Sequence, residues 1–109
     1  MKRKADQANQ LSEAWRHART EAMERSQAKN NSKGTQDNLR RNAIYVGQEF
    51  ERIGINGPHE IKREDFLKWL GGLKEGTLGT KKLGVSTIKK RVETLRAILQ
   101  ACKLHEQLD

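Results

Sequence analysis

The stretch TQDNLRRNAIYVGQEFERIG, residues 35–54, is the strongest indication of the fold in this 109-residue chain. Its apolar residues recur at alternating steps of four and three positions, at Leu39, Ala43, Val46, Phe50 and Ile53. That spacing puts all of them on one side of an α-helix, where they can be buried together. Thr35 is the expected N-cap, Gly47 leaves room for a neighbouring helix, and Gly54 ends the helix before a turn at Pro58.

Two shorter or less apolar segments also follow the helical period. A helix is predicted over residues 5–29, with a thin stripe of alanines around Trp15, and another over about 63–73, around Trp69. Tryptophans at helical spacing are usually core residues, so both are predicted to be buried. The glycine-rich segment that follows the second of these helices, residues 74–84, is predicted to be a flexible polar loop.

The last helix is predicted to begin at Ser86 or Thr87, with Val85 packing against it as a hydrophobic staple. Its buried seam is Ile88, Val92, Leu95, Leu99 and Cys102, with Ile98 beside them and Leu104 and Leu108 as its continuation. No segment alternates apolar and polar residues as a strand does. The sequence therefore predicts an all-α bundle of four main helices, the first of them N-terminal.

Length and composition exclude several classes of protein. A chain of this size forms one compact domain, with no room for a second domain and a large catalytic cleft. The single cysteine, Cys102, forms no internal disulfide, which fits a reducing cytoplasm. Three scattered histidines give no metal-ligand spacing, the glycines match no phosphate-binding loop, and no apolar run is long enough to span a membrane. We expect no cofactor, no metal and no membrane contact.

The positive charge is unevenly distributed along the chain. Lys and Arg number 22 against 14 Asp and Glu, a net charge of +8 that indicates a polyanionic partner. Residues 1–34 carry a net +4, residues 35–76 are neutral, and residues 77–104 carry a net +6. In the last helix, Lys89 and Arg96 lie within about 20° of each other around the axis. This ridge suits a phosphate backbone, although a merely solvated basic face would have the same pattern.

The order of these segments resembles the core-binding domain of tyrosine recombinases, the phage-integrase family. The resemblance covers residues 35–104. It consists of the Thr-initiated helix at 35–54, the IKREDFLKWL segment at 61–70, and the Ser-Thr-Ile…Leu-Arg pattern at 86–96. It implies a small SAM-like helical bundle that grips one face of double-stranded DNA near the strand-exchange point, while a separate catalytic domain closes the clamp.

The resemblance also implies which residues contact DNA, since the first and last helices of that bundle face the major groove. The candidates are Thr35, Arg40 and Arg41 on the first, and Ser86, Thr87, Lys89, Lys90 and Arg96 on the last. The solvent-facing pair Lys81 and Lys82, in the basic loop before the last helix, is added to these candidates. The basic residues of the last helix are selected independently by the charge distribution.

No catalytic residues are predicted. The family's arginine, lysine, histidine and tyrosine machinery would follow near residue 109, so we expect this chain to be a non-enzymatic part of a longer recombinase of bacterial, phage or mobile-element origin. Tyr45, the only tyrosine, is interpreted as a packing or rim contact rather than a nucleophile.

Two alternatives remain open. The chain is divided into an N-terminal helix and linker (residues 1–34) and a DNA-binding domain (residues 35–109), and the N-terminal helix is a candidate contact to other recombinase subunits. The first alternative is that the chain is a helical protein–protein interaction module. An accessory basic protein that binds RNA is compatible with the net charge alone.

Overall fold

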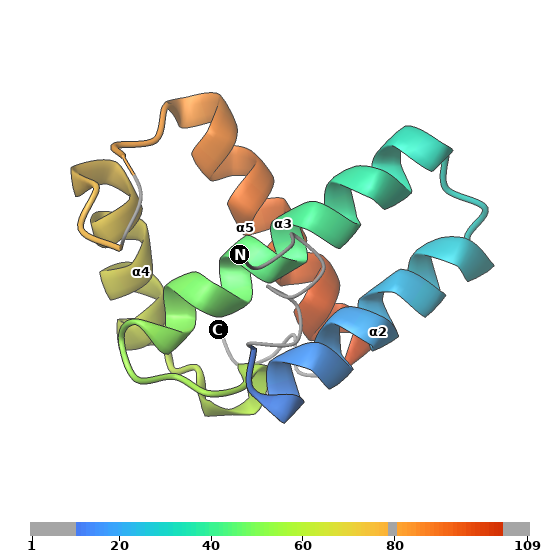
Figure 1. Cartoon of the computed structure of the whole chain (residues 1–109), viewed down its shortest axis with the longest axis horizontal. Coiled ribbons are helices and arrows are strands. Elements are labelled where there is room, and N and C mark those ends of the chain that lie inside the picture. The colour runs from blue at the N-terminus through green and yellow to red at the C-terminus, as the bar shows by residue number, and fades with distance from the viewer. Residues whose placement is uncertain (1–10, 79–80, 104–109) are drawn as a thin grey trace, which may run out of the picture.

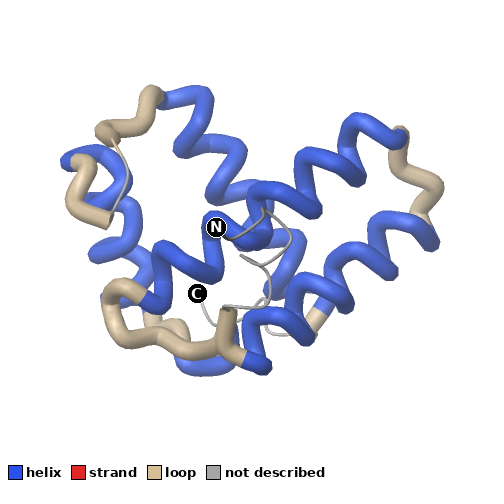
Figure 2. Tube along the Cα trace, in the orientation of Figure 1, coloured by secondary structure: helices blue, strands red, loops and turns tan. Residues whose placement is uncertain are grey.

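The structure is a computed structural model that describes residues 11–78 and 81–103 (Figure 1). Within them lie four α-helices, one short 3-10 helix and no strand, which confirms the predicted all-α class (Figure 2). The elements are α2 (Glu13–Ala28), α3 (Lys33–Glu51), η1 (Pro58–Glu60), α4 (Arg63–Glu75) and α5 (Val85–Ala101). None of these helices is long and apolar enough to cross a membrane. The predictions for residues 1–10, 79–80 and 104–109, including Leu104 and Leu108, lie outside the described residues.

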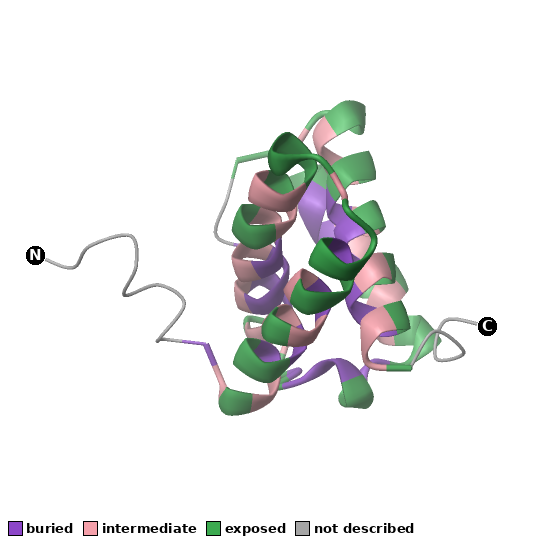
Figure 3. Ribbon diagram, turned by 90° about the vertical axis from the view of Figure 1, so that its right-hand side faces the viewer, coloured by how far each residue is buried: buried purple, intermediate pink, exposed green. Residues whose placement is uncertain are grey.

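The helices α2 and α3 run antiparallel, joined by a short turn, and α5 crosses against both of them (Figure 1). The helix α4 lies at the other end of α3 and packs on α5. Buried residues of all four helices face one another in the interior (Figure 3). The helix α2 is thus docked inside the same hydrophobic core as α3 and α5. A separate function for residues 1–34 stays a prediction.

Three stacked aromatic rings form the centre of this core. Phe50 of α3 lies between the two tryptophans, with ring centroids 5.6 Å from Trp15 of α2 and 4.8 Å from Trp69 of α4. Both tryptophans are at most 1% exposed, as predicted. The Trp15 indole N–H donates to the carbonyl oxygen of Ile55 at 3.0 Å, so burial leaves this polar group satisfied. The stack therefore joins three helices through the seam predicted for residues 39–53.

Two glycines permit close packing. A Cβ at Gly47 would lie 3.0 Å from Leu11 and 3.4 Å from Trp15, which confirms the predicted approach of a neighbouring helix. A Cβ at Gly72 would lie 2.6 Å from the buried side chain of Leu78. The helix α4 continues through Gly71–Gly72 to Glu75, two residues beyond its predicted end, and Gly76 caps it with a φ of +76° that favours glycine.

The loop after α4 is held more firmly than its glycine content predicts. Leu78 is buried against Gly72, and the backbone N–H of Leu83 donates to the carbonyl oxygen of Leu73 at 3.1 Å. Lys81 and Lys82 are exposed, as expected. The described part of the loop is thus attached to α4 on both sides of the lysine pair.

The predicted starts of three helices are wrong. The helix predicted from residue 5 does not run unbroken: Ser12 caps α2, its hydroxyl oxygen accepts the Trp15 backbone N–H at 3.4 Å, and the helix begins at Glu13. Ser32, not Thr35, caps α3: its hydroxyl oxygen accepts the Thr35 backbone N–H at 3.2 Å, and the helix begins at Lys33. Thr35 occupies the third helical position, where its N–H needs such an acceptor. The helix α5 begins after Gly84 with no side-chain cap, so neither Ser86 nor Thr87 is its N-cap. Val85 is 86% exposed and does not act as a staple.

Candidate nucleic-acid interface

The basic run Lys89-Lys90-Arg91 on α5 is divided among three environments. Successive residues of an α-helix point about 100° apart, so three neighbours cannot share one face. Lys89 and Lys90 are exposed, whereas Arg91 is only 7% exposed. The seam of α5 is accordingly not purely apolar: Leu95, Ile98 and Leu99 are buried together with Arg91 and Thr94, while Ile88, Val92 and Cys102 are partly buried.

The outer face of α5 carries Lys89 and Arg96, both exposed. Neither side chain forms an ion pair or hydrogen bond within residues 11–78 and 81–103. Ser86 is exposed near the beginning of the same helix, and Thr87 is half-buried. This face is therefore solvated and carries two unpaired cations, with the exposed Glu93 about 40° round the axis from Lys89.

Beside that face, α5 borders a cleft of about 280 Å³. The wall from α5 consists of Lys90, Glu93, Thr94 and Ala97, and the opposite side is formed by Ser26, Asn31, Thr35, Asn38, Leu39 and Asn42. Two candidate DNA contacts that are far apart in the sequence, Thr35 and Lys90, thus lie on one cleft. The remaining lining residues were not anticipated.

The other candidates do not converge on this cleft. Arg40 forms an ion pair with Asp37 at 2.9 Å, and its carbonyl oxygen accepts the Nε–H of Arg19 from α2 at 3.0 Å. Arg40 therefore belongs to the side of α3 that faces α2. Arg41 is exposed about 100° round the helix from it. Lys81 and Lys82 are exposed in the loop that precedes α5.

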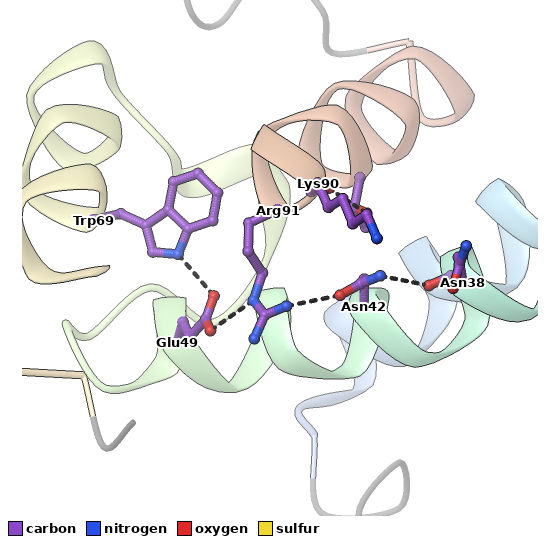
Figure 4. Close-up of polar contacts among 7 residues, drawn as sticks. Asn38, Asn42, Glu49, Trp69, Lys90 and Arg91 are labelled. Atoms are coloured by element: carbon purple, nitrogen blue, oxygen red, sulfur yellow. Dashed lines mark hydrogen bonds and ion pairs between the residues drawn. The ribbon is translucent and has the colours of Figure 1, made fainter. Parts of the chain in front are cut away.

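A buried polar network behind the cleft connects three helices (Figure 4). Glu49 of α3, 2% exposed, accepts from Arg91 Nε at 2.9 Å and from Trp69 Nε1 at 3.1 Å. Another guanidinium nitrogen of Arg91 donates to Asn42 Oδ1 at 2.7 Å, and Asn42 Nδ2 donates to the carbonyl oxygen of Asn38 at 2.9 Å. The network fixes α5 relative to α3 and α4 and so orients the basic face.

The ring of Tyr45 completes the surroundings of Arg91. It lies 4.6 Å from the guanidinium carbon, close enough for a cation–π interaction. Tyr45 is half-buried on α3 and packs on Arg91, in the packing role expected of it. Burial raises the pKa of the Glu49 carboxyl, while the charge of Arg91 and the hydrogen bonds from Arg91 and Trp69 oppose the rise.

Sequence reasoning missed this network because it counted Arg91 only as one of the positive charges of residues 77–104. A signal was present: Glu49 lies three residues after Val46, and Arg91 lies three residues after Ile88, so both occupy seam positions of their helices. Opposite charges at the seams of two helices indicate a buried pair. With Arg91 removed, residues 77–104 retain six exposed basic residues against Glu93, a net of +5.

Two features of the described residues concern metal binding and thiol reactivity. They hold no group of three His, Cys, Asp or Glu side chains that could bind a metal ion. Burial raises the pKa of the Cys102 thiol, with a further rise from the negative charge of Glu21, so this thiol is a poor nucleophile at neutral pH.

Comparison of the chain with family models, curated proteins and solved structures gave no match.

Proposed function

We propose that this chain is a double-stranded DNA-binding module in which α5 enters the major groove. The observation that supports it is the outer face of α5, where Lys89 and Arg96 are exposed and unpaired within the described part of the chain. An α-helix about 10–12 Å wide fits a B-DNA major groove about 12 Å wide. Because α5 has no side-chain cap, the N–H groups of its first turn can also meet a phosphate.

The resemblance to the core-binding domain extends this proposal. In a tyrosine recombinase the core-binding domain grips one face of the DNA, and we propose the same role for this bundle. Strand exchange then requires a second domain that supplies the nucleophile. The order of α3, α4, the loop and α5 supports this interpretation. Reading the gene beyond residue 109 tests it: a domain with the arginine–histidine–tyrosine set is expected, and an unrelated or absent domain would contradict it.

The protein–protein alternative has lost the observation that motivated it. The stripe of α2, Trp15, Ala18 and Ala22, is buried against this chain's own α3 and α5. It is not available to a partner while α2 stays docked.

The RNA-binding alternative is tested by competition. Unlabelled duplex RNA and unlabelled duplex DNA are each added to the complex of the protein with a labelled DNA duplex, and we expect the DNA to compete better.

The main test is charge reversal on α5. The triple variant Lys89→Glu, Lys90→Glu and Arg96→Glu is expected to abolish binding to a fluorescent duplex at low salt, because phosphate contacts depend on those charges. The matched control is Lys62→Glu, Arg63→Glu and Lys68→Glu on or beside α4, which gives the same net charge with all three positions exposed. Parental affinity in the α5 triple variant would refute the proposal. An equal loss of DNA affinity in both variants would mean that binding depends on net charge alone and not on α5, which would also contradict the proposal.

A further inference from the structure

The cleft beside α5 and the outer face of α5 are adjacent sides of one helix. Lys89 lies on the outer face, and Lys90, one residue later and about 100° round the axis, lines the cleft. In Figure 4, Lys90 extends to the Asn42 side of Arg91, away from Trp69. Anything that contacts the outer face along the length of α5 therefore has the cleft at its flank.

A helix in the major groove has a sugar–phosphate strand along each side, because the groove is scarcely wider than the helix. We infer that the cleft between α5 and α3 seats one of these strands. This inference rests on the proposed function and deepens it by naming the groups that contact the DNA backbone.

The cleft provides donors from both of its walls. Lys90 supplies an ammonium group from α5. Thr35 supplies a hydroxyl from α3, whose oxygen accepts from Ser32 and whose proton is therefore free to be donated. Asn38, one turn further along α3, is exposed, and its side-chain amide has no hydrogen-bond partner within residues 11–78 and 81–103. Lysine, threonine and asparagine are common donors to phosphate and sugar oxygens.

Asn38 is the new contact in this assignment, since no sequence pattern selected it. Asn42, its neighbour in the cleft, is already engaged: its oxygen accepts from Arg91 and its nitrogen donates to the Asn38 carbonyl. Asn42 therefore shapes the floor of the cleft, whereas Asn38 is free to bind.

The effect of Glu93 on DNA affinity distinguishes a phosphate strand in the cleft from base edges in the cleft. Its carboxylate lines the same cleft, is exposed, and forms no ion pair among the described residues. Next to a phosphate strand this charge is repulsive and lowers the affinity. If the cleft received base edges instead, Glu93 would accept a hydrogen bond from cytosine N4 and raise the affinity.

The experiment compares three cleft variants, Lys90→Gln, Asn38→Asp and Glu93→Gln, in binding to a short mixed-sequence duplex over a range of salt concentrations. Two α4 variants with matched charge changes, Lys68→Gln and Glu75→Gln, serve as controls, since both positions are exposed and outside the cleft. Circular dichroism of each variant verifies the helical fold.

We expect Lys90→Gln and Asn38→Asp to weaken binding by about twofold to fivefold, and Glu93→Gln to strengthen it by a similar factor. Lys90→Gln should also reduce the slope of log K against log salt by about 0.9, the loss of one phosphate contact, and Lys68→Gln should not.

Two outcomes overturn the inference while leaving the proposed function intact. One is weaker binding by Glu93→Gln. The other is cleft variants that behave like the α4 controls while Lys89→Gln and Arg96→Gln lose affinity. If the parent protein fails to bind any duplex at low salt, the proposed function and this inference fail together.

Discussion

The inner and outer faces of α5 use the same kind of side chain for opposite purposes. Arg91, on the inner face, is buried against Glu49, Asn42 and Tyr45. Arg96, five residues later on the outer face, is exposed and unpaired within the described part of the chain. One arginine therefore holds the helix in place, and the other is available to a ligand.

This difference teaches that net charge does not measure the charge that can bind DNA. A guanidinium taken out of water requires a partner, and Glu49 provides it at 2.9 Å. The two opposite charges largely offset each other, so Arg91 adds little to the positive charge at the surface of α5. The position of the exposed basic residues of α5 depends on this pair and on the apolar seam, which hold α5 in place.

The largest effect is expected from Arg91→Met, which leaves the carboxylate of Glu49 buried without its cation. We expect the free energy of unfolding to fall by about 3–5 kcal/mol in urea titrations. The control Arg96→Met should change it by no more than about 0.5 kcal/mol. Adding Glu49→Gln to Arg91→Met should restore much of the loss, since glutamine still accepts from Trp69. A similar cost for both arginines would contradict the distinction between the faces.

The cost of Arg91→Met should depend on pH. Burial raises the pKa of Glu49, and Arg91 opposes that rise, so in the variant the carboxyl takes up a proton at higher pH than in the parent. An acid with a raised pKa in the folded state stabilises the fold at low pH, and this stabilisation is lost as the pH rises through the folded pKa. The deficit of Arg91→Met should therefore be smaller near the ordinary Glu value of 4.5 than at neutrality. A deficit that grows on acidification would refute this account.

A smaller effect is expected from Tyr45→Leu, which removes the ring beneath Arg91. The loss of a partly buried cation–π contact should lower the free energy of unfolding by about 0.5–1 kcal/mol. The conservative variant Tyr45→Phe keeps the ring and should remain close to the parent. In the Arg91→Met background the effect of Tyr45→Leu should largely vanish, because a double-mutant cycle isolates the pairwise interaction. Additive effects would mean that the two side chains do not interact.

The smallest change in stability is expected on the outer face. The double variant Lys89→Gln and Arg96→Gln should unfold within about 0.5 kcal/mol of the parent, because both side chains are exposed and unpaired there. The same variant should bind duplex DNA more weakly, with a shallower salt dependence. A large loss of stability would show that this face has a structural role.

Much of the fold could be predicted because apolar periodicity is a local property. The spacing of Leu39, Val46 and Phe50 indicated a buried helix face, and in the structure Val46 and Phe50 are fully buried, with Phe50 at the centre of the aromatic stack. Helix starts were less predictable, since several residues near Ser32 and Thr35 can cap. The choice between them depends on which oxygen reaches an unpaired N–H.

The candidate site was predictable only in part. Sequence indicated the basic ridge of Lys89 and Arg96, because residues seven apart share a helix face. It could not bring Thr35 to Lys90, since 55 positions separate them and only the crossing of α3 and α5 makes them neighbours. Asn38 and Glu93 became candidates for the same reason.

The amino-acid sequence was enough to predict four amphipathic helices, two buried tryptophans and a basic last segment, because each depends on spacing along one helix or on simple charge counts. The tertiary structure decided which charges remain at the surface. Arg91 and Glu49 are 42 positions apart in the chain, and only packing of α5 on α3 places them within hydrogen-bond distance. Burial and pairing are properties of contacts between helices, so the division of Lys89, Lys90 and Arg91 among solvent, cleft and core follows from how α5 is packed.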